Sequence, residues 1–149
     1  MRKFRFRLEA LKTLRESSRQ RVLMELTKVL TKEQLLVVRE KEVRLELTKV
    51  QYSLSRWIQP GTLSSNRILE AHHFREALVR ELGVLDQQRK ELQGEIDRRR
   101  EDFLIADREF QMLEKLRDRS LKNYSLSEQH REIQTADSST QHSRRRTDS

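Results

Sequence analysis

Hydrophobic residues recur at every seventh position along most of this chain, and this spacing limits its fold more than any other feature. In the first half the row consists of Val22, Val29, Leu36, Val43, Val50 and Trp57. In the second half it consists of Ala71, Leu78, Leu85, Leu92, Arg99, Ala106 and Leu113. A seven-residue repeat keeps one face of a helix turned toward a partner helix while the two supercoil. The chain is therefore predicted to form two long helices.

Each row has a companion row four residues further on, which completes the coiled-coil pattern. In the first half the companion row is Leu26, Glu33, Glu40, Leu47 and Leu54. In the second half it is Leu82, Arg89, Ile96, Phe103, Phe110, Arg117 and Tyr124. The charged Glu33 and Glu40 interrupt the apolar seam of the first half.

The segment from Gln59 to Asn66 separates the two halves and contains the Pro60-Gly61 pair. Proline removes a backbone donor and ends a helix, so the first helix must stop near Ile58. The segment ends in three residues that are suitable N-caps for the second helix: Ser64, Ser65 and Asn66.

We therefore predict an all-α fold, an elongated two-helix antiparallel coiled-coil hairpin over residues 1–125. The helices are expected at about 4–58 and about 66–124, joined by a turn at about 59–65, with a disordered polar tail at 126–149. At a rise of about 1.5 Å per residue the first helix would be roughly 80 Å long. Both termini of the hairpin would lie at one end.

Composition agrees with this architecture. The 149 residues are 38% charged, 34% hydrophobic and 5% aromatic, well below the about 45–50% apolar content of globular domains. The chain has no cysteine, which excludes disulfides and thiolate metal sites and fits a reducing compartment. No apolar run approaches the roughly 18 residues of a membrane span, and the N-terminus lacks the apolar region of a signal peptide. We expect a cytoplasmic protein.

Positive charge is concentrated at the N-terminus. The net charge is +8, and residues 1–21 contribute +6 of it, from eight Lys or Arg against Glu9 and Glu16. Such an end can meet an acidic protein surface, anionic lipid or nucleic acid, and charge alone does not choose between them. Arg144, Arg145 and Arg146 in the tail are interpreted as a solvated cluster, with electrostatic docking as the alternative.

No motif for catalysis is present: there is no Gly-rich phosphate loop, His-Glu-x-x-His, nucleophile elbow or cysteine nucleophile. His72 and Glu76 share a helix face, but zinc needs three or four ligands, so they are interpreted as surface residues. We therefore expect a non-enzymatic protein without a cofactor or metal ion.

Two apolar groups are candidate contact surfaces. Near the N-terminus, Phe4, Leu8 and Leu11 follow helical i, i+4, i+7 spacing. Phe6 and Leu14 lie beside this stripe, and Arg5 and Arg7 lie between its members. This stripe either packs on the second helix or binds a partner. A partner is plausible because charged residues occupy the extrapolated seam rows: Lys12, Arg15 and Arg19.

The second group surrounds the predicted turn and contains Tyr52, Trp57, Phe74 and Leu78. Trp57 and Leu78 lie on the heptad rows and are expected to clamp the hairpin. Tyr52 and Phe74 lie off these rows and are expected to contact a partner. In a two-helix protein no third element covers every apolar residue, so part of this group is expected to be exposed.

The opening segment, Phe-Arg-Phe-Arg-Leu-Glu-Ala-Leu-Lys-Thr-Leu-Arg-Glu from Phe4 to Glu16, resembles the start of the FliJ family of flagellar type III export proteins. Members of that family often begin Phe-x-Phe-x-Leu-x-x-Leu-x-x-Leu-Arg. The resemblance extends to the whole layout, with two long helices, a short turn, and a second helix that carries Phe74 and Leu78 soon after its start.

The resemblance implies a component of the bacterial flagellar export apparatus, at the inner face of the cell membrane at the flagellar base. It implies a stalk that binds the hexameric export ATPase, the large membrane subunit of the export gate, and export chaperones. The ATPase-facing end would include Phe4, Arg5, Phe6, Arg7, Leu8, Leu11 and Leu14, together with the helix around Phe110 to Tyr124. The gate-facing patch would include Tyr52, Phe74 and Leu78.

Three other interpretations remain open at this point. A basic coiled coil can bind nucleic acid through phosphates, although acidic residues are interleaved along most of the chain and elements for base readout are missing. A parallel homodimeric scaffold would use the same heptads between chains, although Pro60-Gly61 argues against a continuous helix. A stalk protein of a related injectisome would share the fold and the partners by analogy.

Overall fold

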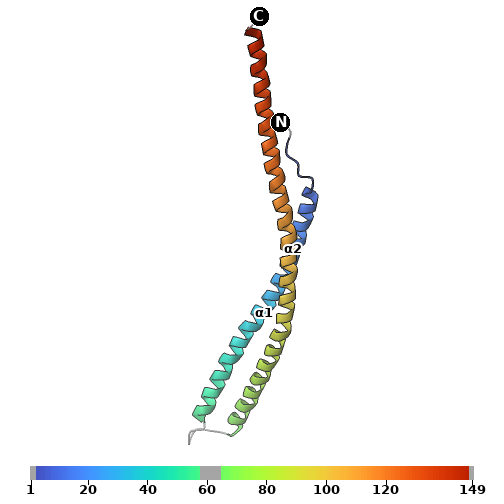
Figure 1. Ribbon diagram of the computed structural model, residues 1–149. Coiled ribbons are helices and arrows are strands. Elements are labelled where there is room, and N and C mark those ends of the chain that lie inside the picture. Colours follow the sequence, from blue (N-terminus) through green and yellow to red (C-terminus); the bar gives the residue numbers. More distant parts are fainter. Residues whose placement is uncertain (1–2, 58–64, 148–149) are drawn as a thin grey trace. The chain divides into compact units, whose positions relative to one another are not determined.

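The computed structural model describes residues 3–57 and 65–147, and both described stretches are dominated by helix (Figure 1). Helix α1 spans Glu9–Trp57 and helix α2 spans Ser65–Thr147. The all-α, two-helix prediction is therefore confirmed. Most of the predicted turn, with Pro60 and Gly61, lies outside the described residues.

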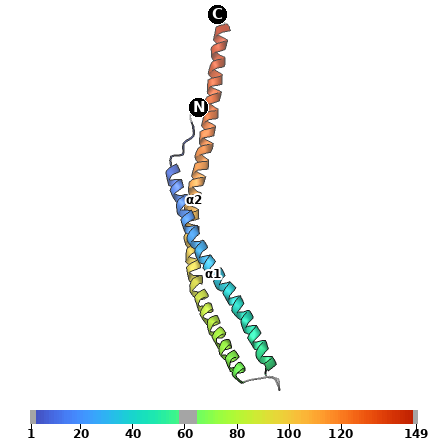
Figure 2. The ribbon, with the colours of Figure 1, turned by 180° about the vertical axis from the view of Figure 1, so that it is seen from behind.

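The chain divides into two compact units, and both helices contribute to each. One unit contains Val22–Phe103, and the other contains Met1–Arg21 with Leu104–Ser149. Within Val22–Phe103, α1 and α2 lie side by side with opposite chain directions, as the two opposed views show (Figures 1 and 2). The two helices are therefore antiparallel, as predicted.

The core follows the predicted rows. Among the described residues, every buried side chain lies on one of the four heptad rows: Leu26, Val29, Val43, Leu54, Leu78, Leu85, Ile96, Ala106, Phe110 and Leu113. Burying one Leu or Ile side chain contributes about 1.5–3 kcal/mol. A narrow seam of this kind is the main apolar stabilisation available to two helices without a third layer.

The tightest part of the seam in Val22–Phe103 is built around Val43, which is completely buried. Val43 clusters with Leu78 and Leu85 from α2. Half-buried residues from both helices pack against this cluster: Leu36, Leu47, Val50 and Leu82. Leu78, one of the residues proposed for a partner contact, is 3% exposed and belongs to this core.

Two of the charged residues on the seam rows, Glu40 and Arg89, pair across the helices. Arg89 Nη1 lies 2.7 Å from Glu40 Oε2, and Arg44 on α1 also donates to Glu40. Beside the seam, Arg39 donates to both carboxylate oxygens of Glu81, at 2.6 and 3.0 Å. The interruption predicted at Glu40 is therefore filled by an interhelical ion pair, which a shift of the register would break.

The ends of the helices differ from the prediction. Helix α1 begins at Glu9 instead of Phe4, and α2 continues to Thr147 instead of ending near Tyr124. The disordered tail predicted at 126–149 is therefore corrected to helix through Thr147. No glycine or proline follows Gly94, and hydroxyls along the tail donate to backbone oxygens four residues back, as Thr140 does to Ala136 at 2.7 Å.

The tail nevertheless lacks a packed face. Every side chain from 129 to 146 is exposed, so this part of α2 depends on helical hydrogen bonds and on short-range contacts along the helix. Apolar patterning was the signal behind the prediction, and it correctly indicated that the seam stops near Tyr124. It did not distinguish a solvated helix from a disordered segment.

The interhelical ion pairs make stability dependent on pH. The hydrogen bonds from Arg44 and Arg89 hold the pKa of Glu40 below its usual value, and the Arg39 hydrogen bond does the same to the pKa of Glu81. Carboxyls with a lowered folded-state pKa stabilise the fold above their unfolded pKa, and this stabilisation is lost as the pH falls through the folded pKa.

We therefore predict that Glu40→Gln/Glu81→Gln lowers the melting temperature at about pH 7 and has a smaller effect at about pH 3, because the stabilisation that comes from a lowered folded-state pKa declines below the unfolded-state pKa of glutamate. Circular dichroism melts of both proteins at the two pH values measure this. Glu114→Gln, at an exposed site, is the matched control. A difference in melting temperature that does not change with pH would contradict the assignment.

Candidate interaction surfaces

The N-terminal segment Lys3–Leu8 precedes α1 and is not helical in its first four residues. Its side chains alternate: Phe4, Phe6 and Leu8 are half-buried, whereas the intervening basic residues are exposed. The Phe4 ring lies 5.5 Å from the Tyr124 ring of α2, centroid to centroid. The segment therefore packs its apolar side chains as an extended chain does, with a period of two.

This packing corrects the predicted helical stripe of Phe4, Leu8 and Leu11. The sequence Lys-Phe-Arg-Phe-Arg-Leu alternates strictly between charged and apolar residues, which is the pattern of an extended segment with one covered face. Residues 5–8 also include no Ser, Thr, Asp or Asn to cap an earlier helix start. The sequence contains both this alternation and the i, i+4, i+7 spacing of Phe4, Leu8 and Leu11, and the prediction followed the second pattern.

Ion pairs connect the first turns of α1 to α2. Arg15 Nη1 lies 2.7 Å from Glu109 Oε2, and Arg19 Nε lies 3.1 Å from Asp107 Oδ1. The Arg19 guanidinium also lies 4.9 Å from the centre of the Phe110 ring. Arg15 and Arg19, two of the three basic residues on the extrapolated seam rows, thus continue the pairing of the helices, and they do not mark a break that leaves the seam open.

Arg117 occupies a seam position in the same unit. Its Nε is buried without a hydrogen-bond partner among the described residues, and the nearest carboxylate oxygen is Glu9 Oε2, at 3.6 Å. A buried donor without an acceptor costs free energy. The start of α1 is therefore held less firmly by this pair than by the shorter Arg15–Glu109 contact.

The predicted ATPase-facing residues fall into two groups. Leu11 and Leu14 on α1 are 38% and 61% exposed, and Arg5 and Arg7 are exposed as well. The half-buried group is Phe4, Phe6 and Leu8. The exposed group forms a basic and apolar surface that is accessible without any rearrangement of the chain.

The predicted gate-facing residues are also divided. Tyr52 and Phe74 are 63% and 49% exposed, in agreement with their positions off the heptad rows. Arg56 lies over the Tyr52 ring at 5.7 Å. Leu78 is buried, so its assignment as a direct contact is corrected: it packs the seam.

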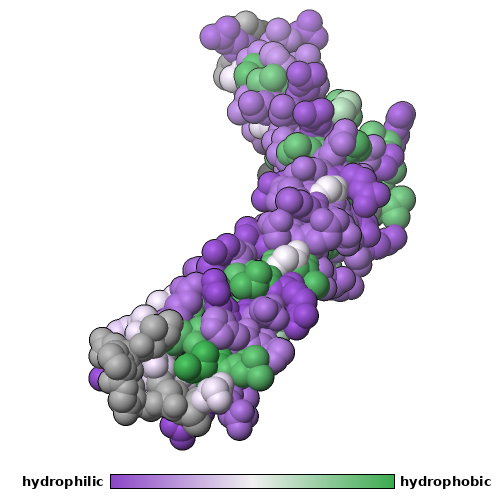
Figure 3. Space-filling model, turned by 90° about the horizontal axis from the view of Figure 1, so that it is seen from below, coloured by the Kyte–Doolittle hydropathy of each residue, from purple (hydrophilic) through white to green (hydrophobic). Residues whose placement is uncertain are grey.

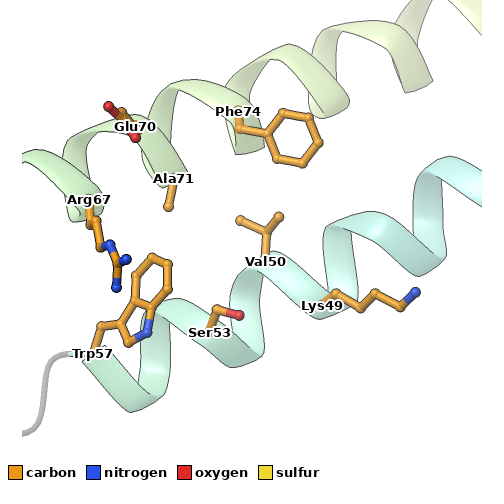
Figure 4. A pocket seen from close by; sticks show the side chains of 8 residues that line it. All are labelled: Lys49, Val50, Ser53, Trp57, Arg67, Glu70, Ala71 and Phe74. Carbon is orange, nitrogen blue, oxygen red and sulfur yellow. The ribbon is translucent and has the colours of Figure 1, made fainter.

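A groove with a volume of about 580 Å³ opens between α1 and α2 near Phe74. Val50 and Ala71 face each other across it, and the Trp57 and Phe74 rings stand at its two ends (Figure 4). The groove is completed by Lys49, Ser53, Arg67 and Glu70. Ala71 is a small residue at a seam position, and this leaves space for the groove. An alanine on a heptad row is the feature of the sequence that could have indicated the groove.

No cluster of three or more His, Cys, Asp or Glu side chains suited to a metal ion occurs in the described parts of the chain. His72 and Glu76 are both exposed there. Within residues 3–57 and 65–147, no helix is long and apolar enough to cross a membrane.

Comparison with known proteins gives no relative. No protein-family model, no curated protein and no solved structure matches this chain.

The extended packing of the N-terminal segment can be tested by substitution at alternate positions. We predict that Phe4→Ser/Phe6→Ser releases the segment, because both side chains leave the covered face, whereas Arg5→Ser/Arg7→Ser does not. Heteronuclear ¹⁵N relaxation of the amides of residues 3–8 reports the release. If Phe6→Ser alone had no effect while Phe4→Ser alone released the segment, the helical stripe would be the better description.

Proposed function

We propose that this chain is a non-enzymatic stalk component of the bacterial flagellar protein export apparatus. In this proposal it couples the hexameric export ATPase to the membrane export gate, engages export chaperones, and works at the inner face of the cell membrane. The observation that carries the proposal is the N-terminal sequence from Phe4 to Glu16, which resembles the FliJ family and forms a basic, partly apolar surface on a helix pair.

The charge distribution supports contact with an acidic partner at this surface. Arg5 and Arg7 are exposed next to the exposed Leu11 and Leu14. Positive charge of this kind steers an acidic partner into place and accelerates association, and the adjacent apolar side chains then supply contact area. Binding to the ATPase ring is therefore expected to weaken as the salt concentration rises.

The groove near Phe74 supports a second contact in the other unit. Exposed aromatic side chains next to a concave surface are typical anchors at protein interfaces. Phe74 lines this groove, whereas Tyr52 lies outside it; both are exposed, and we assign both to the export gate. Leu78 contributes by holding α1 and α2 together. The two proposed contacts use different residues, so they can be tested separately.

The test is ATP hydrolysis and hexamer formation by the flagellar export ATPase of the same organism. Wild-type protein is expected to stimulate hydrolysis or ring assembly, and Phe4→Ala/Leu8→Ala/Leu11→Ala is expected to abolish this effect. Tyr52→Ala/Phe74→Ala is the matched control and should retain it, because these residues belong to the other contact.

Because Phe4 and Leu8 also pack on the protein itself, a second variant is needed. Arg5→Ala/Arg7→Ala/Leu14→Ala changes only exposed side chains, so its fold should be intact by circular dichroism while stimulation falls. No stimulation by the wild type at low salt would contradict the proposal. Tight, steeply salt-dependent binding to a DNA or RNA duplex in its place would favour the nucleic-acid alternative.

A further inference from the structure

The side of α1 that faces away from α2 carries a second heptad row, in addition to the seam. Its positions within Val22–Phe103 are Met24, Thr31, Val38, Leu45 and Tyr52. The four larger residues of this row are 62%, 44%, 58% and 63% exposed, in chain order. Leu35, beside the row, is 65% exposed. Figure 3 shows apolar side chains at the surface among the polar ones.

The packing of the hairpin does not explain this row. Each row position follows a seam position by two residues, a rotation of about 200° around the helix, so the row points away from α2. Single exposed apolar residues are normal on protein surfaces. A row that repeats every seven residues over four heptad steps has instead the geometry that matches another helix.

The charged residues that flank this row are mainly basic. Residues three or four places from the row members include Lys28, Lys41, Lys49 and Arg56, against the single acidic Glu42. Glu42 is already paired with Arg39, at 3.4 Å. Among the described residues, Lys41 and Lys49 form no ion pair, so their charges are available to a partner.

We propose that this outward row of α1 binds an acidic amphipathic helix of a partner protein. The heptad spacing requires a helix with its own apolar row, and the lysines require Glu or Asp at the positions that flank that row. A second copy of this chain is a poor occupant, because pairing row to row would place the basic flanks opposite one another. The row is also narrow, whereas a helix that lies on a membrane needs a broad apolar face.

The first experiment uses a synthetic four-heptad peptide with Leu at positions a and d and Glu at positions e and g, which repels its own copies. The comparison peptide has Lys at e and g. Isothermal titration calorimetry with the full chain is expected to give binding at least about tenfold tighter for the Glu peptide, with an affinity that falls as salt rises.

The second experiment changes the protein. Leu45→Glu at the centre of the row is expected to weaken binding of the Glu peptide at least about tenfold, a loss of about 1.4 kcal/mol. Val84→Glu is the matched control, because Val84 is 55% exposed on α2 and lies off the row. Both sites are exposed, so circular dichroism should show an unchanged helix content.

Several results would overturn the proposal. These are absence of binding by the Glu peptide, equal affinity for the two peptides, and equal loss in Val84→Glu. Sedimentation equilibrium that shows self-association abolished by Leu45→Glu would make a second copy the occupant. Binding to anionic phosphatidylserine vesicles that Leu45→Glu abolishes, without peptide binding, would make the row a lipid surface. None of these results depends on the flagellar proposal, because the assays contain no export component.

Discussion

The packing of α1 against α2 is the interaction on which the other features depend. Two helices offer each other only one face, so the buried side chains gather on four rows and no third layer adds to them. At some row positions that lack apolar residues, opposite charges meet across the interface, as Glu40 and Arg89 do in one unit and Glu9 and Arg117 do in the other. Apolar contacts supply most of the stability, and the ion pairs favour one register over its neighbours.

The same constraint explains the exposed surfaces. A hairpin cannot cover apolar residues that lie off its seam, so Tyr52, Phe74 and Leu14 remain exposed. In a globular domain such side chains would be covered by another layer of helices or strands. Here they stay accessible, and basic residues lie next to several of them in the sequence. Two paired helices can therefore expose several separate apolar surfaces along their length.

The sequence predicted the seam correctly because heptad spacing reports directly on which face of a helix is covered. The heptad rows also separated the exposed Tyr52 and Phe74 from the buried Leu78, which they placed in the seam. The contact role of Leu78 came from the family resemblance. The helix ends were predicted less well, because the segment around Phe6 satisfies both a period of two and a helical spacing. Packing on Tyr124 decides between them, and that contact joins residues too far apart in the chain for local patterning to reveal.

The central claim is that α1 and α2 pair within one chain in the register that places Val43 with Leu78 and Leu85. The chain has no cysteine, so spin labels can be placed at introduced cysteines and their separation measured by double electron–electron resonance. The account predicts that Thr48→Cys/Ala77→Cys gives a shorter distance than Thr48→Cys/Val84→Cys, because the second pair is offset by about 10 Å along the helix. It also predicts no short distance for Thr48→Cys alone. A short distance in the singly labelled protein, or the reverse order in the two pairs, would contradict it.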